Sequence, residues 1–178
     1  MNIGIRQFRD LKQFFRDGLK SVWRMLNKSY IRASVRLIDR ILVVDKAYLR
    51  SRIDEARECI KEIERIVSKP YVDLTNDEKY SLRYQIIVLV EAVGSACLHI
   101  AMEDFDYEPG SYRDCIRYLE NSGITVQTEN IIRIIGLRNL LVHRYWVVDD
   151  RRIYESAKND FQKIKDFLKA VESKYELR

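Results

Sequence analysis

Apolar residues recur at steps of three and four along most of the chain, which is the spacing of amphipathic helices. The helices predicted in this way cover about 46–68, about 77–104, Ser111 to Gly123, Thr128 through Leu140, and Ile153 to Val171. The second of them is apolar on most of its sides, so we expect it at the centre of a bundle. Thr75 and Glu78 form the Thr-x-x-Glu capping box expected at its start.

Residues that form turns are scarce, since the chain has only six glycines and two prolines among 178 residues. Sandwiches and barrels need many turns, so this scarcity disfavours both. The sequence therefore predicts an all-α fold, an antiparallel up-and-down helix bundle with short connections and an N-terminal helical extension.

The N-terminal extension is strongly basic. A helical apolar stripe runs from Ile5 to Leu26, and residues 1–36 carry nine basic and two acidic residues, whereas the net charge of the whole chain is +5. Three interpretations stay open: a solvated face that covers the bundle, contact with nucleic acid, or association with a membrane surface. We expect two parts, the basic amphipathic helical extension 1–44 and the bundle domain 45–178.

Cysteine and histidine usage argues against a disulfide framework and a metal site. The three cysteines are odd in number and form no Cys-x-x-Cys pair, which fits a reducing cytosol. His99 and His143, the only histidines, are too far apart in sequence for the spacing of a Cys/His metal site. No charge-free apolar run of about 18 residues and no signal peptide is evident. We expect a cytoplasmic protein without a metal or cofactor, for which membrane association is unlikely.

Candidate chemistry gathers between Ile135 and Trp146. Arginine and histidine five positions apart, as Arg138 and His143 are, project about 140° away from each other on an ideal helix. They converge only if the helix ends or unwinds between them, which Asn139 and the following residues would permit. An imidazole that titrates near neutrality can move a proton while a guanidinium holds charge on a phosphate. The alternative is that both cations only cap a helix C-terminus.

Other residues are weaker candidates. Glu91, on the apolar helix, is either a second partner of Arg138 or half of a structural ion pair between helices. Arg144 and Trp146 could bind RNA, the latter by stacking on a base, but aromatic residues beside valines more often simply pack. His99 is most simply a satisfied histidine of the core.

The pattern Arg138-x-x-x-x-His143-x-Tyr145 resembles the R-x-x-x-x-H-x-Y signature of the HEPN superfamily, specifically of the HepT-like toxin family. The resemblance covers about 45–175 in the right order. Its segments are Arg83 to Ile100, Ser111 to Ile124, Gly136 to His143 with Tyr145-Trp146, and Asp149 to Tyr154.

This resemblance implies an all-α homodimer in which two motif copies face one another. It also implies metal-independent endoribonuclease chemistry, in which the 2′-hydroxyl of RNA attacks the adjacent phosphate and Arg138 and His143 carry catalysis. Asn139 and Tyr145 are expected as auxiliary residues. The implied partner is a small nucleotidyltransferase antitoxin, MntA, which adds AMP to the motif tyrosine, here Tyr145.

Two further classes of protein stay open at this point. The bundle could be a non-catalytic binding partner of a nucleotidyltransferase, or a purely structural dimerisation bundle. The intact pair of Arg138 and His143 favours the enzyme, since a binding module has no need of both.

Overall fold

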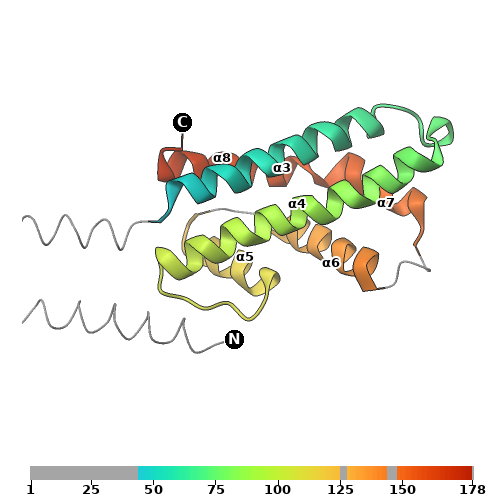
Figure 1. Cartoon of the computed structure of the whole chain (residues 1–178). Coiled ribbons are helices and arrows are strands. Elements are labelled where there is room, and N and C mark those ends of the chain that lie inside the picture. Colours follow the sequence, from blue (N-terminus) through green and yellow to red (C-terminus); the bar gives the residue numbers. More distant parts are fainter. Residues whose placement is uncertain (1–43, 125–127, 144–147, 178) are drawn as a thin grey trace, which may run out of the picture. The chain divides into compact units, whose positions relative to one another are not determined.

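The computed structural model describes residues 44–124, 128–143 and 148–177, and all regular structure in these ranges is helical (Figure 1). With the labels of Figure 1, the elements are α3 (Lys46–Val67), the short 3-10 turn η1 (Tyr71–Asp73), α4 (Asn76–Glu103), α5 (Tyr112–Asn121), α6 (Glu129–His143), α7 (Asp150–Asp160) and α8 (Gln162–Tyr175). The prediction of an all-α fold is confirmed. The boundary between extension and bundle stays a prediction, because residues 1–43 lie outside the described residues.

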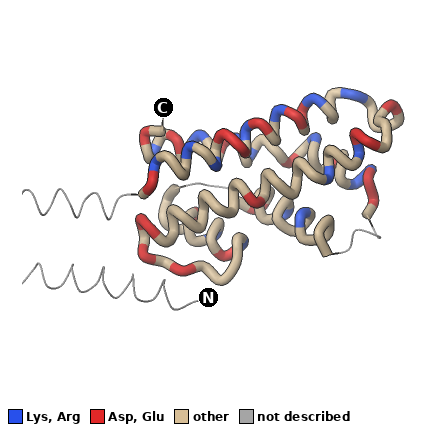
Figure 2. Tube along the Cα trace, viewed as in Figure 1, with Lys and Arg blue, Asp and Glu red and all other residues tan. Residues whose placement is uncertain are grey.

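The helices form an up-and-down bundle around α4. Helices α3 and α4 make an antiparallel hairpin, α6 runs back along α4, and α7 and α8 return along α3 (Figure 1). Two ion pairs show that α3 and α8 are antiparallel, because Arg57 in the middle of α3 bonds Glu172 near the end of α8, whereas Glu64 near the end of α3 bonds Lys165 near the start of α8. Figure 2 shows basic and acidic residues interleaved along α3, whereas α4 is largely uncharged.

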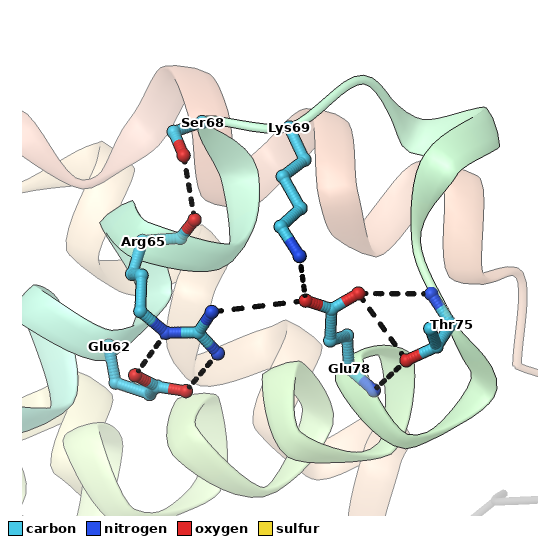
Figure 3. A network of polar contacts seen from close by, with 6 residues as sticks. All are labelled: Glu62, Arg65, Ser68, Lys69, Thr75 and Glu78. Atoms are coloured by element: carbon cyan, nitrogen blue, oxygen red, sulfur yellow. Dashed lines mark hydrogen bonds and ion pairs between the residues drawn. The ribbon is translucent and has the colours of Figure 1, made fainter.

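A polar network stabilises the corner between α3 and α4 (Figure 3). Thr75 Oγ1 accepts a hydrogen bond from the Glu78 backbone N–H at 3.2 Å, and the Glu78 carboxylate accepts one from the Thr75 N–H at 3.0 Å. Lys69 donates to Glu78 at 2.5 Å, and this bond, followed by the one from Thr75, lowers the pKa of the carboxyl group. The predicted capping box is therefore confirmed.

Helix α4 supplies the centre of the core. Its fully buried side chains include Ile86, Leu89 and Ile100. Among the described helices only α4 is long and apolar enough to cross a membrane by length and composition, but 56% of its apolar window is buried inside the bundle. Since α3, α5 and α6 all pack against it, its apolar character is that of a core helix, as the sequence predicted.

The C-terminal part differs from the prediction, because one long helix is replaced by two. Helix α7 ends at Asp160 and α8 begins at Gln162, with the buried Phe161 between them. Asn159 and Asp160 precede the interruption. The side chains of both residue types form hydrogen bonds with nearby backbone groups in non-helical conformations, which competes with the hydrogen bonds of the helix. The three cysteines are free and buried, which confirms the expectation that no disulfide framework exists.

Candidate active site

Helix α6 carries the Arg-x-x-x-x-His pair and is continuous from Glu129 to His143. The helix neither ends nor unwinds between the two residues, so the condition under which they would converge within one chain is not met. Leu140 and Leu141 are good helix formers, and burial of Leu141 holds this turn against the bundle. As a result no hydrogen bond joins Arg138 to His143 among the described residues, and the two side chains leave the helix in different directions.

The guanidinium of Arg138 is held by two neighbours. Its Nη2 donates to Glu91 Oε1 on α4, and its Nη1 donates to Asn139 Oδ1 at 3.1 Å. Arg138 Nε is buried and has no hydrogen-bond partner among the described residues. The side chain of Arg138 is 23% exposed, so the planar group is reachable from solvent while its orientation is fixed. Glu91 is thus bonded to Arg138 in an ion pair between α4 and α6, which fits both interpretations that the sequence left open for it.

Tyr112 on α5 supports this ion pair from the other side. Its hydroxyl donates to Glu91 Oε2 at 2.8 Å, so each carboxylate oxygen of Glu91 binds a different residue. Burial, followed by the bond to Glu91, raises the pKa of the Tyr112 hydroxyl, which therefore remains a neutral donor.

Gly94 provides the space for the Tyr112 ring. A methyl group placed on Gly94 would lie 2.6–2.7 Å from three carbon atoms of this ring, closer than non-bonded carbons can approach. Our sequence reasoning did not identify Gly94 or Tyr112 as parts of the site. The signal in the sequence was Gly94 itself, a glycine inside a strongly apolar helix. Glycine destabilises a helix by about 1 kcal/mol relative to alanine, so its presence there indicates that a neighbouring group needs the space.

His143 is the last residue of α6 and its side chain is exposed. Arg144, Tyr145 and Trp146, for which the sequence predicted RNA contact or modification, lie outside the described residues. The described residues resume at Val148, just before α7. There Arg83 of α4 makes two hydrogen bonds of 2.7 Å to the Asp150 carboxylate.

The second histidine of the chain has a structural role. His99 Nε2 accepts a hydrogen bond of 3.0 Å from the backbone N–H of Asp45, the residue that caps α3. Its ring also contacts that of Tyr48, with centroids 4.7 Å apart. The interpretation of His99 as a histidine with a satisfied hydrogen bond is confirmed, but its side chain is half-buried and does not lie in the core.

An all-α bundle with an Arg-x-x-x-x-His pair at the end of one helix has the organisation of a HEPN domain. The model of one family within this class, described as "Ribonuclease HepT-like", matches residues 56–171. The chain therefore belongs to the HepT-like ribonuclease family and is an enzyme of the ribonuclease class.

Two solved structures share the fold. One is a crystal structure of a toxin–antitoxin with AMP-PNP, with a TM-score of 0.65 and 18% identity, covering 71% of this chain and 98% of the matched chain. The other is YutE from Bacillus subtilis, a cytosolic protein of unknown function, with a TM-score of 0.61 and 19% identity, covering 71% and 90%. No match was found among the curated proteins.

Proposed function

We propose that this protein is a metal-independent endoribonuclease toxin of a toxin–antitoxin system and acts in the cytoplasm. The observation that carries the proposal is the pairing of a solvent-reachable, oriented Arg138 with an exposed His143 in a chain of the HepT-like ribonuclease family. The first group can bind a phosphate, and the second can move a proton near neutral pH.

In the proposed reaction the 2′-oxygen of a ribose forms a bond to the adjacent phosphorus while the bond from phosphorus to the 5′-oxygen breaks. His143 serves as the acid/base group, with a proton leaving the 2′-hydroxyl and a proton reaching the departing 5′-oxygen. Arg138 stabilises the charge of the phosphorane, and Asn139 keeps its guanidinium oriented. The products are a 2′,3′-cyclic phosphate and a 5′-hydroxyl end.

We further propose that the working site is formed by two copies of the chain. Arg138 and His143 point in different directions from a continuous helix, so a two-fold axis that brings two motifs to one cleft would let both act on one phosphate. Val142 beside His143 is apolar and 39% exposed, which suits burial between two copies. Light scattering at micromolar concentration should give a dimer; an active monomer would contradict this part.

Regulation by a nucleotidyltransferase antitoxin is the third part of the proposal. One structural neighbour is a toxin–antitoxin solved with AMP-PNP, an ATP analogue, and this supports a partner that uses ATP. AMP on Tyr145 would place a negative, bulky group two residues from His143 and would compete with RNA for Arg138.

Intact-mass spectrometry after incubation with the cognate nucleotidyltransferase and ATP tests this regulation. Wild type should gain AMP, Tyr145→Phe should not, and Tyr84→Phe should gain it as wild type does. Tyr84 is a matched control because its side chain is 63% exposed on α4. AMP on Tyr145→Phe would assign the modification to another residue.

The reaction itself is tested with a single-stranded RNA that carries one 2′-deoxy residue at the mapped cleavage position. Wild type should cut the all-ribose strand in excess EDTA and leave the modified position intact, because the attacking hydroxyl is missing. Cleavage at the modified position would contradict attack by the 2′-oxygen.

A further inference from the structure

Arg113, the second residue of α5, reaches across to α6. A methyl group placed on Gly136 of α6 would lie 3.9 Å from Arg113 Nη2, so the guanidinium rests beside the one residue of this turn that has no side chain. Gly136, Asn139 and His143 follow one another at steps of three and four and share one face of α6. Arg113 therefore lies on the α6 face that ends in His143.

The distance along this face suits a nucleic-acid strand. Seven residues separate Gly136 from His143, which is about 10 Å along the helix axis. A stacked strand carries one phosphate per roughly 3.4 Å, so this length spans about three nucleotides.

The charge of Arg113 is available to a ligand. Its side chain is exposed, and within the described ranges no ion pair or hydrogen bond joins it to a carboxylate. The nearby carboxylates are already engaged. Asp114 accepts hydrogen bonds from the Tyr107 hydroxyl at 2.9 Å and the Gly110 N–H at 3.0 Å. Arg113 differs in this respect from Arg138, whose guanidinium is bonded to the Glu91 carboxylate.

Arg117 repeats the arrangement one turn further along α5. It is exposed, and the described part of the chain gives it no carboxylate partner. Residues four apart on a helix have Cβ atoms about 6 Å from one another, so Arg113 and Arg117 project from the same face of α5. Two adjacent, unpaired guanidinium groups fit a polyanion better than a single acidic side chain.

We propose that Arg113 and Arg117 form a subsite that binds backbone phosphates of the RNA next to the phosphate cleaved at His143. This inference rests on the proposed ribonuclease function, which it deepens by assigning how the substrate strand is held. Phosphate contacts of this kind position a strand without reading its sequence, so the subsite contributes affinity and register rather than base preference.

The test uses the full-length Arg113→Gln/Arg117→Gln variant, because glutamine keeps length and polarity and removes only charge. Arg152→Gln is the matched control, since Arg152 is exposed on α7 and has no carboxylate partner among the described residues. Steady-state cleavage should show a KM raised about tenfold or more in the double variant. Its kcat should stay within threefold of wild type, and the control should leave both values unchanged.

Binding of the 2′-deoxy-blocked RNA, measured by fluorescence anisotropy at several salt concentrations, gives a readout independent of cleavage. The slope of log K against log salt should become shallower by about 1.4, or about 0.7 for each lost phosphate contact on a single strand. A structural role of the two arginines would leave this slope unchanged.

The outcomes separate the inference from the function on which it rests. If wild type cuts no RNA but binds the all-ribose strand with a steeper salt slope than the double variant, the proposed function fails and the subsite remains. If the double variant cuts and binds RNA as wild type does, the inference is overturned. The inference is also overturned if the double variant loses only its binding to the nucleotidyltransferase, because Arg113 and Arg117 would then belong to a protein interface.

Discussion

Replacing Gly94 by alanine tests the packing that positions the Arg138 guanidinium. Alanine is the better helix former by about 1 kcal/mol, so propensity alone predicts a more stable protein. The new methyl group, however, would lie 2.6–2.7 Å from three atoms of the Tyr112 ring. Overpacking of this kind costs about 1–3 kcal/mol. Displacing the ring also breaks the bond from Tyr112 to Glu91, which adds roughly 1.5–3 kcal/mol for a charged acceptor.

Together these contributions, less the gain of about 1 kcal/mol in helix propensity, predict that Gly94→Ala lowers the free energy of unfolding by about 1.5–5 kcal/mol. Urea titration followed by circular dichroism measures this value. Gly136→Ala is the matched control, because a methyl group there would meet only Arg113 Nη2, at 3.9 Å. It should raise the free energy of unfolding by about 0.5–1 kcal/mol.

The double variant Gly94→Ala/Tyr112→Ala isolates the contact between these two residues. Without the ring the methyl group has room, so the two changes should cost at least about 1 kcal/mol less together than their sum. If Gly94→Ala is as stable as wild type, or if the effects of the two changes on stability are additive, the Tyr112 ring does not pack against Gly94. In that case this contact cannot be what positions Glu91 and Arg138.

Three further changes test separate contacts. Glu91→Ala should lower kcat/KM for RNA about tenfold through loss of Arg138 orientation, whereas Glu91→Gln should recover most of it because the amide oxygen still accepts a hydrogen bond. The Tyr175 hydroxyl donates a hydrogen bond to Asp104 at 2.7 Å, and burial, followed by this bond, raises the pKa of the hydroxyl. The neutral hydroxyl therefore contributes fully to stability below pH 10, the pKa of a free tyrosine, and this contribution is lost as pH rises above that value. Tyr175→Phe should therefore destabilise the protein by about 1–2 kcal/mol in urea titrations at pH 8, and by less above pH 10. Thr75→Ala should remove the capping box of α4 and cost about 1 kcal/mol in the same assay.

The parts of the fold that follow from local sequence could be predicted. The ends of α3 and α4 agree with their predicted positions to within one residue, because apolar periodicity and the Thr75–Glu78 box are both local signals. The central place of α4 also followed from its pattern, since a helix that is apolar on most sides has to be covered by others.

Contacts between distant helices could not be predicted. The bond from Tyr112 to Glu91 joins residues 21 apart, and that from Arg138 to Glu91 joins residues 47 apart. The sequence indicated Arg138 as a candidate, and a glycine within an apolar helix signalled a close packing contact at Gly94, but nothing in the sequence identified the Tyr112 ring as the partner in that contact. Whether the Tyr112 ring reaches Gly94 depends on how α5 packs on α4, and the periodicity of apolar residues does not determine this packing.

The sequence left open whether α6 continues past Asn139, because Asn has only modest helix propensity. Burial of Leu141 outweighs that preference. Tertiary packing commonly overrides weak local propensities, and here it decides the directions in which Arg138 and His143 point.

Comparison of the two histidines shows whether His143 carries RNA cleavage. Wild type, His143→Ala and His99→Ala are assayed on a panel of defined single-stranded RNAs in excess EDTA, at a temperature where circular dichroism shows all three folded. His143→Ala should lose at least ~100-fold in rate, the usual scale for removing a general acid/base group. His99→Ala should retain activity, because His99 bonds the start of α3. Undiminished cleavage by His143→Ala, with the same 2′,3′-cyclic phosphate ends, would show that His143 is not the acid/base group.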